Sequence, residues 1–198
     1  VANNFETEVH LMLVDSHCHL DFPDLAGQLD SVFALMRTND VAYALSVSVT
    51  LEDFPKILRI AEANPHIFAS VGVHPDYADA PPVTVEQLTT LAAHPKVVAI
   101  GETGLDYFRL QGDLEWQRDR FRTHMRAARE AQKPLIIHTR SAADDTLRLM
   151  RDECAAEAGG VMHCFTESYD VAKQALDKHQ NNGGPLPGSS LRLTGINR

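Results

Sequence analysis

The feature of this sequence that most restricts its fold is a regular alternation of apolar, β-branched runs with segments of helical periodicity. Six such pairs follow one another along the chain of 198 residues. The apolar runs are 11–16, 41–49, 67–73, 97–100, 135–137 and 161–162, and the helical segments are 24–37, 51–63, 83–93, 113–132, 142–155 and 168–178. Each helix provides the crossover that parallel strands require. The pattern therefore predicts an α/β fold built on a parallel sheet.

The polar residues that follow these runs distinguish an open, doubly wound sheet from a closed barrel. An open sheet builds its site from two or three strand ends at one switch point. Here ligand-type side chains follow the first, fourth, fifth and sixth runs, and His74 follows the third. Only a barrel brings so many carboxyl ends of strands to one mouth. We therefore predict a (β/α)8 TIM-type barrel, with a single domain at 12–198 and a leader at 1–11.

The C-terminal part of the chain departs from this pattern. Residues 180–190 are rich in Asn, Gly, Pro and Ser, which predicts a loop, and 191–196 is a candidate seventh strand. A TIM barrel usually has about 250 residues. We therefore expect six to seven strands, a barrel that is incomplete at its C-terminal end, and an atypical segment at 180–198.

Composition narrows the functional classes. The net charge of −9 argues against a broadly basic nucleic-acid-binding surface, although bound dications reverse the field inside a pocket. No apolar run is long enough to predict a membrane span, and the first residues lack the pattern of a signal peptide. Three cysteines, an odd number, predict free thiols in a reducing cytoplasm. Nothing in the sequence indicates an obligate protein partner.

Five side chains at strand ends predict a metal centre. His17 and His19 lie two residues apart, so the strand period points both to one side and Cys18 to the other. The set predicted to bind metal is His17, His19, Glu102, His138 and His163. Imidazole and carboxylate together favour Zn, Mn, Fe or Ni over Ca or an all-oxygen Mg site. Cys18 and Cys164 neighbour these residues but are predicted to pack in the core.

Five ligands exceed the needs of one catalytic ion, which keeps a position open for water. A natural division gives His17 and His19 to one ion and His138 and His163 to a second, with Glu102 bridging the two. Two ions about 3.5–4 Å apart clamp the attacking and leaving oxygens of a phosphoryl displacement and lower the pKa of bound water. Taken singly, each residue has a structural alternative, as a helix cap, a surface charge or a core histidine. Their common position at strand ends favours the functional interpretation.

A second group lies beside the predicted mouth. Arg140 offers a planar fork for phosphate, and Tyr107 offers an aromatic ring on which a base stacks. We predict that His74, Arg140 and Tyr107 contact substrate. The alternative is a solvated loop with capping interactions, which applies equally to the neighbouring Asp106 and Arg109.

These residues occur within recognisable motifs, at 15–21 (DSHCHLD), 72–75 (GVHP), 101–107 (GETGLDY), 138–140 (HTR) and 163–165 (HCF). In their order and spacing the motifs resemble the TatD family of metal-dependent deoxyribonucleases, which are amidohydrolase-like barrels. The resemblance implies hydrolysis of DNA phosphodiester bonds, commonly as a 3′→5′ exonuclease, with two divalent ions (Mg, Mn or Zn) and Glu102 as the catalytic bridge. It also implies that His17 and His19 bind the first ion, that His138 and His163 bind the second, and that His74 and Arg140 face the substrate.

One family motif is missing from the sequence. The eighth strand of the family ends in Glu-Thr-Asp, whose Asp completes the first metal site and orients water, and no such tripeptide occurs here. The general base is therefore unassigned, with Asp106 the nearest carboxylate by motif. Two alternatives stay open: a metal-binding but inactive or incomplete barrel, and a hydrolase of another ester or amide.

Overall fold

A computed structural model describes residues 12–176 and 191–193; the predicted leader at 1–11 and most of 180–198 lie outside the described residues. Seven parallel strands form one sheet in sequential order, β1 to β7. Their bounds are β1 Leu13–Cys18, β2 Val41–Ser46, β3 Ile67–Val71, β4 Val97–Asp106, β5 Leu135–Arg140, β6 Gly160–Met162 and β7 Leu191–Leu193. The parallel pairing and the sequential order are those predicted for a TIM-type barrel.

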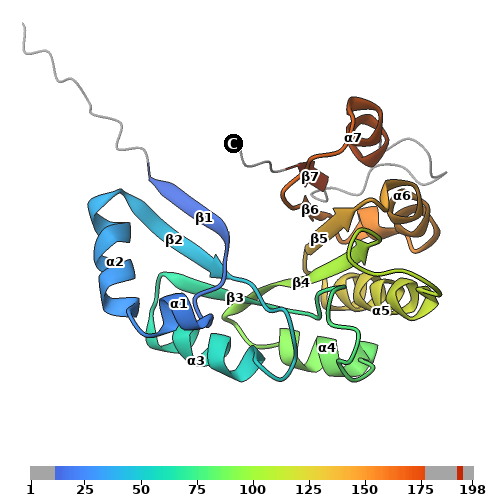
Figure 1. Ribbon diagram of the computed structural model, residues 1–198. Helices are drawn as coiled ribbons and strands as arrows, with labels where there is room; N and C mark the ends of the chain where they lie inside the picture. The colour runs from blue at the N-terminus through green and yellow to red at the C-terminus, as the bar shows by residue number, and fades with distance from the viewer. Residues whose placement is uncertain (1–11, 177–190, 194–198) are drawn as a thin grey trace, which may run out of the picture.

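Helices cover the outer side of the curled sheet (Figure 1). They are α1 Pro23–Ala26, α2 Leu29–Thr38, α3 Phe54–Ala63, α4 Val85–Ala92, α5 Glu115–Ala131, α6 Ala143–Asp152 and α7 Tyr169–Leu176, with a 3-10 turn at Ala155–Glu157. The single helix predicted at 24–37 is two helices, because the chain breaks at Gly27 and Gln28. Within the described residues the sheet is an open arc, since β1 and β7 each pair with one neighbour. Among these residues no helix is both long and apolar enough to span a membrane.

The core has two layers that follow the alternation of side chains along the strands. Ile100 and Ile137 belong to the large cluster that packs the sheet against the helices. The alternate residues Val47, Ala99 and Ile136 form a smaller cluster on the inner side. Filling both faces of the sheet is the property that makes a barrel a packed core rather than a pore. The carboxyl ends of the strands then form its mouth.

Strand β4 is longer than the sequence pattern predicts, and this extension positions the mouth. The strand continues past the apolar run 97–100 to Asp106, and its pairing with β5 is irregular between Ile100 and Thr103, where Glu102 lies. Gly101 and Gly104 have positive φ angles of 142° and 136°, and a Cβ on either would lie within 2.6 Å of a β5 carbonyl oxygen. Only glycine accommodates both the conformation and this close approach. The two glycines thus hold Glu102 at the inner edge of the sheet.

A buried histidine in α5 gives the fold a specific pH dependence. His124 is fully buried, and burial lowers its pKa to about 4 from an ordinary value of 6.5. In this window the unfolded chain binds the proton and the folded chain does not, so the free energy of unfolding falls as the pH decreases from 6.5 toward 4.

We predict that the free energy of unfolding of His124→Gln falls less than that of the wild type between pH 6.5 and pH 4. The full shift from 6.5 to about 4 corresponds to about 3 kcal/mol for this one group. Denaturant unfolding at pH 7 and at pH 4.5 measures the difference. Equal pH dependence of the two proteins would show that His124 does not resist protonation.

Candidate metal centre

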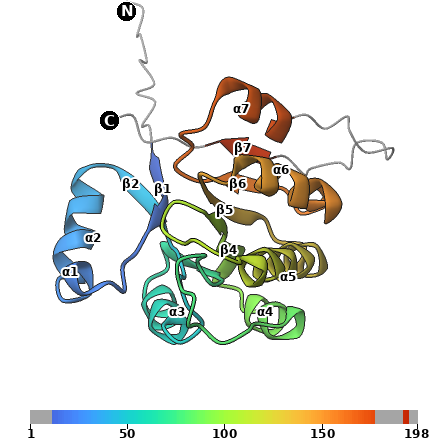
Figure 2. The ribbon, with the colours of Figure 1, turned by 45° about the vertical axis from the view of Figure 1, so that its right-hand side comes forward.

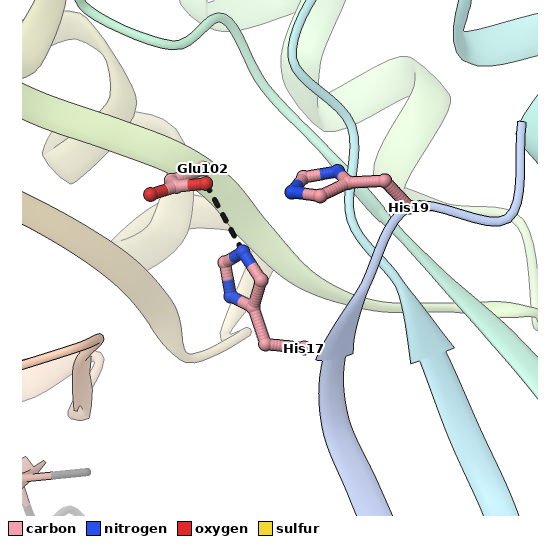
Figure 3. Close-up of side chains that lie close together, drawn as sticks. All are labelled: His17, His19 and Glu102. Carbon is pink, nitrogen blue, oxygen red and sulfur yellow. Dashed lines mark ion pairs between the residues drawn. The ribbon is translucent and has the colours of Figure 1, made fainter. Parts of the chain in front are cut away.

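The histidine pair of β1 faces a glutamate from β4 across the mouth. Figure 3 shows His17 and His19 directed toward Glu102, with His17 Nε2 3.2 Å from Glu102 Oε2. One nitrogen of each histidine and one oxygen of Glu102 all lie within 4.8 Å of one another. β1 and β4 are not neighbours in the sheet, so the curvature of the sheet is what brings these side chains together.

A second group uses the other oxygen of the same carboxylate. Glu102 Oε1 lies 3.3 Å from Nδ1 of His138 and 3.6 Å from Nε2 of His74. These two ring nitrogens are 3.3 Å apart. Glu102 therefore has one oxygen toward the β1 histidines and one toward the β3 and β5 ends. This geometry agrees with the predicted bridge, whose role stays a prediction.

Hydrogen bonds on the far side of each ring determine which nitrogen is free. His19 Nδ1 donates to the carbonyl of Val47 at 3.0 Å, which leaves its Nε2 lone pair available. His138 Nε2 donates to Asp106 Oδ2 at 3.0 Å, which leaves Nδ1 available beside Glu102. Such carboxylate or carbonyl partners are characteristic of histidines that bind metal.

His74 has the opposite arrangement. Its Nδ1 accepts the backbone N–H of Asp76 at 3.2 Å, so in the neutral ring the proton lies on Nε2. Burial lowers the pKa of His74 despite the nearby Glu102, which favours this neutral form. Nε2 then donates a hydrogen bond toward the mouth. Distance alone groups His74 with the ligands, but a ring with its proton on Nε2 offers a hydrogen-bond donor there rather than a lone pair. Its contact with substrate stays a prediction.

His163 lies farther from the carboxylate. Its Nε2 is 4.0 Å from Glu102 Oε1, and its ring stacks on His17 with centroids 3.5 Å apart. Burial and the neighbouring His17 lower the pKa of His163 to about 4, so the ring is neutral. The structure therefore stacks His163 on His17 while its Nε2 faces the Glu102 oxygen that His138 also approaches. Its assignment as a ligand of the second ion stays a prediction.

The charge of the centre resides on Glu102, which is 3 % exposed. Burial acts to raise the pKa of Glu102, but the close approach of His138, His17 and His74 holds it well below its ordinary value. Burial acts to lower the pKa of His138. The negative charges of Glu102 and Asp106 outweigh this effect, so the pKa of His138 is raised above its ordinary value. The mouth thus contains an ionised carboxylate surrounded by imidazoles.

The donor set fits a divalent transition-metal ion. Among the described residues, both ring nitrogens of the half-buried His17 are themselves buried and lack a partner with hydrogen-bond geometry, although Nε2 faces Glu102. An ion between these groups would satisfy the unpaired nitrogen and the buried charge together. His17, His19, Glu102 and His138 offer the nitrogen and oxygen ligands of a Zn, Mn or Fe site.

The rim differs from the sequence-based prediction in its aromatic residue. The hydroxyl of Tyr107 donates to Asp145 Oδ2 at 2.7 Å and accepts from Arg118 at 3.1 Å, which turns it toward α6. Phe108, which the sequence analysis did not single out, is 61 % exposed. The guanidinium of Arg140 lies over its ring at 3.9 Å from the centroid. The available signal was the adjacency of two aromatics in the loop after β4.

Both carboxylate oxygens of Asp106 accept hydrogen bonds from other groups of the protein. Oδ1 accepts the backbone N–H groups of Phe108 and Arg109, and Oδ2 accepts from His138. Its side chain therefore orients His138 and organises the rim, and because it has no exposed surface we do not assign it as the missing general base.

The two cysteines beside the ligands differ. Cys18 is half-buried with its Sγ 3.4 Å from the carbonyl of Leu45, and burial raises the pKa of its thiol to about 12, as core packing predicts. The same prediction is wrong for Cys164, which is exposed. The chain leaves β6 at Met162 and turns through a positive φ of 48° at Cys164, which carries the side chain out of the core.

A parallel α/β barrel with histidine and carboxylate side chains at its carboxyl-end mouth belongs to the metal-dependent hydrolase barrels. The family model of the TatD related DNases matches residues 14–185. This chain therefore belongs to the TatD related DNase family.

Individual relatives agree with this assignment. The metal-dependent hydrolase YcfH of Escherichia coli, itself named uncharacterized, is 41 % identical over 170 residues, which cover 84 % of this chain and 64 % of YcfH. The protein named 3′-5′ ssDNA/RNA exonuclease TatD of Salmonella typhimurium is 29 % identical over 84 % of this chain and 64 % of its own length. The crystal structure of YjjV, a TatD homologue from Escherichia coli, superposes with a TM-score of 0.74 at 28 % identity, covering 82 % of this chain and 63 % of that one. This chain thus spans less than two thirds of these relatives.

We predict that Asp106→Asn weakens metal binding. The amide carries no charge and accepts a weaker hydrogen bond from His138, so the ring loses its fixed orientation. Loss of such a support costs roughly 10- to 100-fold in affinity. Calorimetric titration with Mn²⁺ measures the change, with the exposed Asp113→Asn as the matched control. Equal affinity of the two variants would contradict the orienting role.

Proposed function

We propose that this protein is a divalent-metal-dependent hydrolase of DNA phosphodiester bonds, acting as a 3′→5′ exodeoxyribonuclease with two bound ions. The observation that carries the proposal is the buried carboxylate of Glu102, with one oxygen toward His17 and the other toward His138. Family membership supports the hydrolytic class, and the name of the Salmonella relative supports a nucleic-acid substrate. Its three cysteines are unpaired, in keeping with the predicted cytoplasmic location.

The residues of the centre have complementary roles in this proposal. His17, His19, His138 and His163 offer ring nitrogens as ligands, and Glu102 offers the negative charge that two cations would share. Divalent ions held there would supply Lewis acidity toward water and toward a phosphoryl oxygen. Val47 and Asp106 fix the rings of His19 and His138, so the ligands need little rearrangement.

The rim holds the substrate. His74 donates a hydrogen bond from Nε2 to a phosphate oxygen, and the exposed Arg140 adds a charged fork for the same group. We propose that a nucleobase stacks on the exposed face of Phe108, since the hydroxyl of Tyr107 is held by Asp145. Stacking accepts any base, which suits an enzyme that removes nucleotides in succession.

We predict that Glu102→Gln lowers DNA hydrolysis at least about 100-fold while the protein stays folded. The amide removes the charge that compensates the cations in a site that excludes water. The assay follows shortening of a 5′-labelled single-stranded oligonucleotide in Mg²⁺, Mn²⁺ or Zn²⁺, where a ladder reports 3′→5′ digestion.

Glu157→Gln is the matched control, because Glu157 is an exposed partner of Arg129 far from the mouth. A chelator arm tests the metal requirement, and an RNA oligonucleotide tests the substrate class. Unchanged hydrolysis by Glu102→Gln would contradict the metal centre. Absence of hydrolysis by folded, metal-loaded wild type would contradict the nuclease assignment and favour an inactive barrel or another ester or amide substrate.

We predict that Phe108→Ala raises the KM for single-stranded DNA roughly tenfold with little change in kcat, because it removes one stacked base. Steady-state kinetics on the same oligonucleotide measures it. Tyr169→Ala, which removes an exposed aromatic of α7, is the control. Tyr107→Leu tests the sequence-based prediction in parallel: a larger effect there than at Phe108 would assign the stacking to Tyr107.

A further inference from the structure

Helix α5 carries three polar side chains on the face that it buries. Gln117, Arg120 and His124 are spaced by three and four residues, which places them on one side of the helix. Gln117 and His124 have no exposed surface, and Arg120 is 9 % exposed. A buried helix face is normally apolar, and buried polar groups are retained with specific partners. We call these residues the α5 polar stripe.

The partners of the stripe lie in the loop between β3 and α4, residues 72–84. His124 Nε2 accepts the backbone N–H of Val73 at 3.0 Å, while its Nδ1 donates to the carbonyl of Arg120 at 2.8 Å. Arg120 donates to the carbonyls of Tyr77 at 2.7 Å and Ala80 at 3.2 Å. The α5 helix lies beside α4 on the outer side of β4, so it reaches this loop from behind (Figure 2).

Gln117 connects this loop to the end of β4. Its Nε2 donates to the carbonyl of Pro75 at 3.3 Å, and its Oε1 accepts the backbone N–H of Asp106 at 2.9 Å. Pro75 directly follows His74, and Asp106 orients His138. One side chain therefore contacts the supports of His74 and His138, the two rings nearest Glu102 Oε1.

Arg120 places a charged guanidinium among buried groups, which indicates that the α5 polar stripe has a role beyond filling space. Its hydrogen bonds go to carbonyl oxygens, and desolvation lowers the pKa of its guanidinium. An apolar side chain would fill this position without the cost of burying a charge. Unlike an apolar side chain, the guanidinium forms directional hydrogen bonds, and its planar fork holds the two loop carbonyls in fixed positions.

We propose that Gln117, Arg120 and His124 are positioning residues that set the location of His74 in the mouth. They lie behind the loop and act on the centre through the backbone of residues 73–80. The inference rests on the proposed function insofar as His74 contacts substrate. The placement of the loop itself can be tested without activity.

The first experiment measures amide hydrogen exchange in the full chain. Arg120→Met and His124→Leu should each accelerate exchange in residues 73–80 at least tenfold while strand β2 keeps its protection. Arg126→Met is the matched control, since Arg126 is on the same helix but is exposed and paired with Glu153. Unchanged exchange at 73–80 in the variants would overturn the proposal. Gln117→Leu replaces any variant that does not fold.

The second experiment asks whether the effect passes through His74. His124→Leu should lower kcat/KM roughly 10- to 100-fold, as loss of a supporting shell does. His124→Gln should restore most of it, because its amide oxygen reaches the Val73 N–H as Nε2 does. In a His74→Ala background His124→Leu should cost nothing further. If His124→Leu lowers kcat/KM equally with and without His74→Ala, the stripe has only a general structural role and the proposal is wrong.

The two proposals fail separately. If the wild type hydrolyses no DNA, the proposed function fails, and the exchange experiment still decides whether the stripe holds the loop. If the wild type is active and exchange at 73–80 is unchanged in the variants, the positioning role fails and the nuclease assignment stands.

Discussion

The arrangement of the mouth depends on one buried carboxylate that serves side chains from several strand ends. Placing Glu102 in the interior is costly unless its charge is compensated. The compensation comes from His17 at one oxygen and from His74 and His138 at the other. Each of these rings approaches from a different part of the chain, so the carboxylate is stabilised only when the sheet has curled far enough to bring them together. Burial and curvature are thereby coupled.

The backbone of β4 makes this position possible. Gly101 and Gly104 allow the strand to lie closer to β5 than any residue with a Cβ would permit. The strand therefore continues past its apolar run, and Glu102 enters the mouth from within strand β4 rather than from a loop. Ligands on strands are held more precisely than ligands on loops. The adjoining loop after β4 then presents Phe108 at the rim, where Arg140 from the end of β5 lies over its ring.

Around the carboxylate, the orientation of each ring is determined from behind. A backbone carbonyl fixes His19, a carboxylate fixes His138, and a backbone N–H fixes His74 in the opposite tautomer. This difference separates two rings that bind cations well from one that donates a hydrogen bond. Helix α5 extends the same principle outward, because its buried polar groups hold the loop on which His74 lies. The site is thus supported by two successive layers of hydrogen bonds.

The sequence by itself determined the parallel α/β barrel and the strand ends that carry His17, His19, Glu102 and His138. It could do so because strand periodicity, crossover helices and the common direction of parallel strands are local or topological rules. Only the tertiary structure decided that His163 stacks on His17, that Cys164 is exposed, and that Phe108 rather than the hydroxyl of Tyr107 faces solvent. These features depend on the curvature of the sheet and on hydrogen-bond partners that no local pattern identifies. Asp145, the partner of Tyr107, is distant in sequence, and the Asp76 N–H reaches His74 through the conformation of its loop. No local pattern encodes those directions, because they arise only when the packed elements leave each side chain a single satisfied orientation.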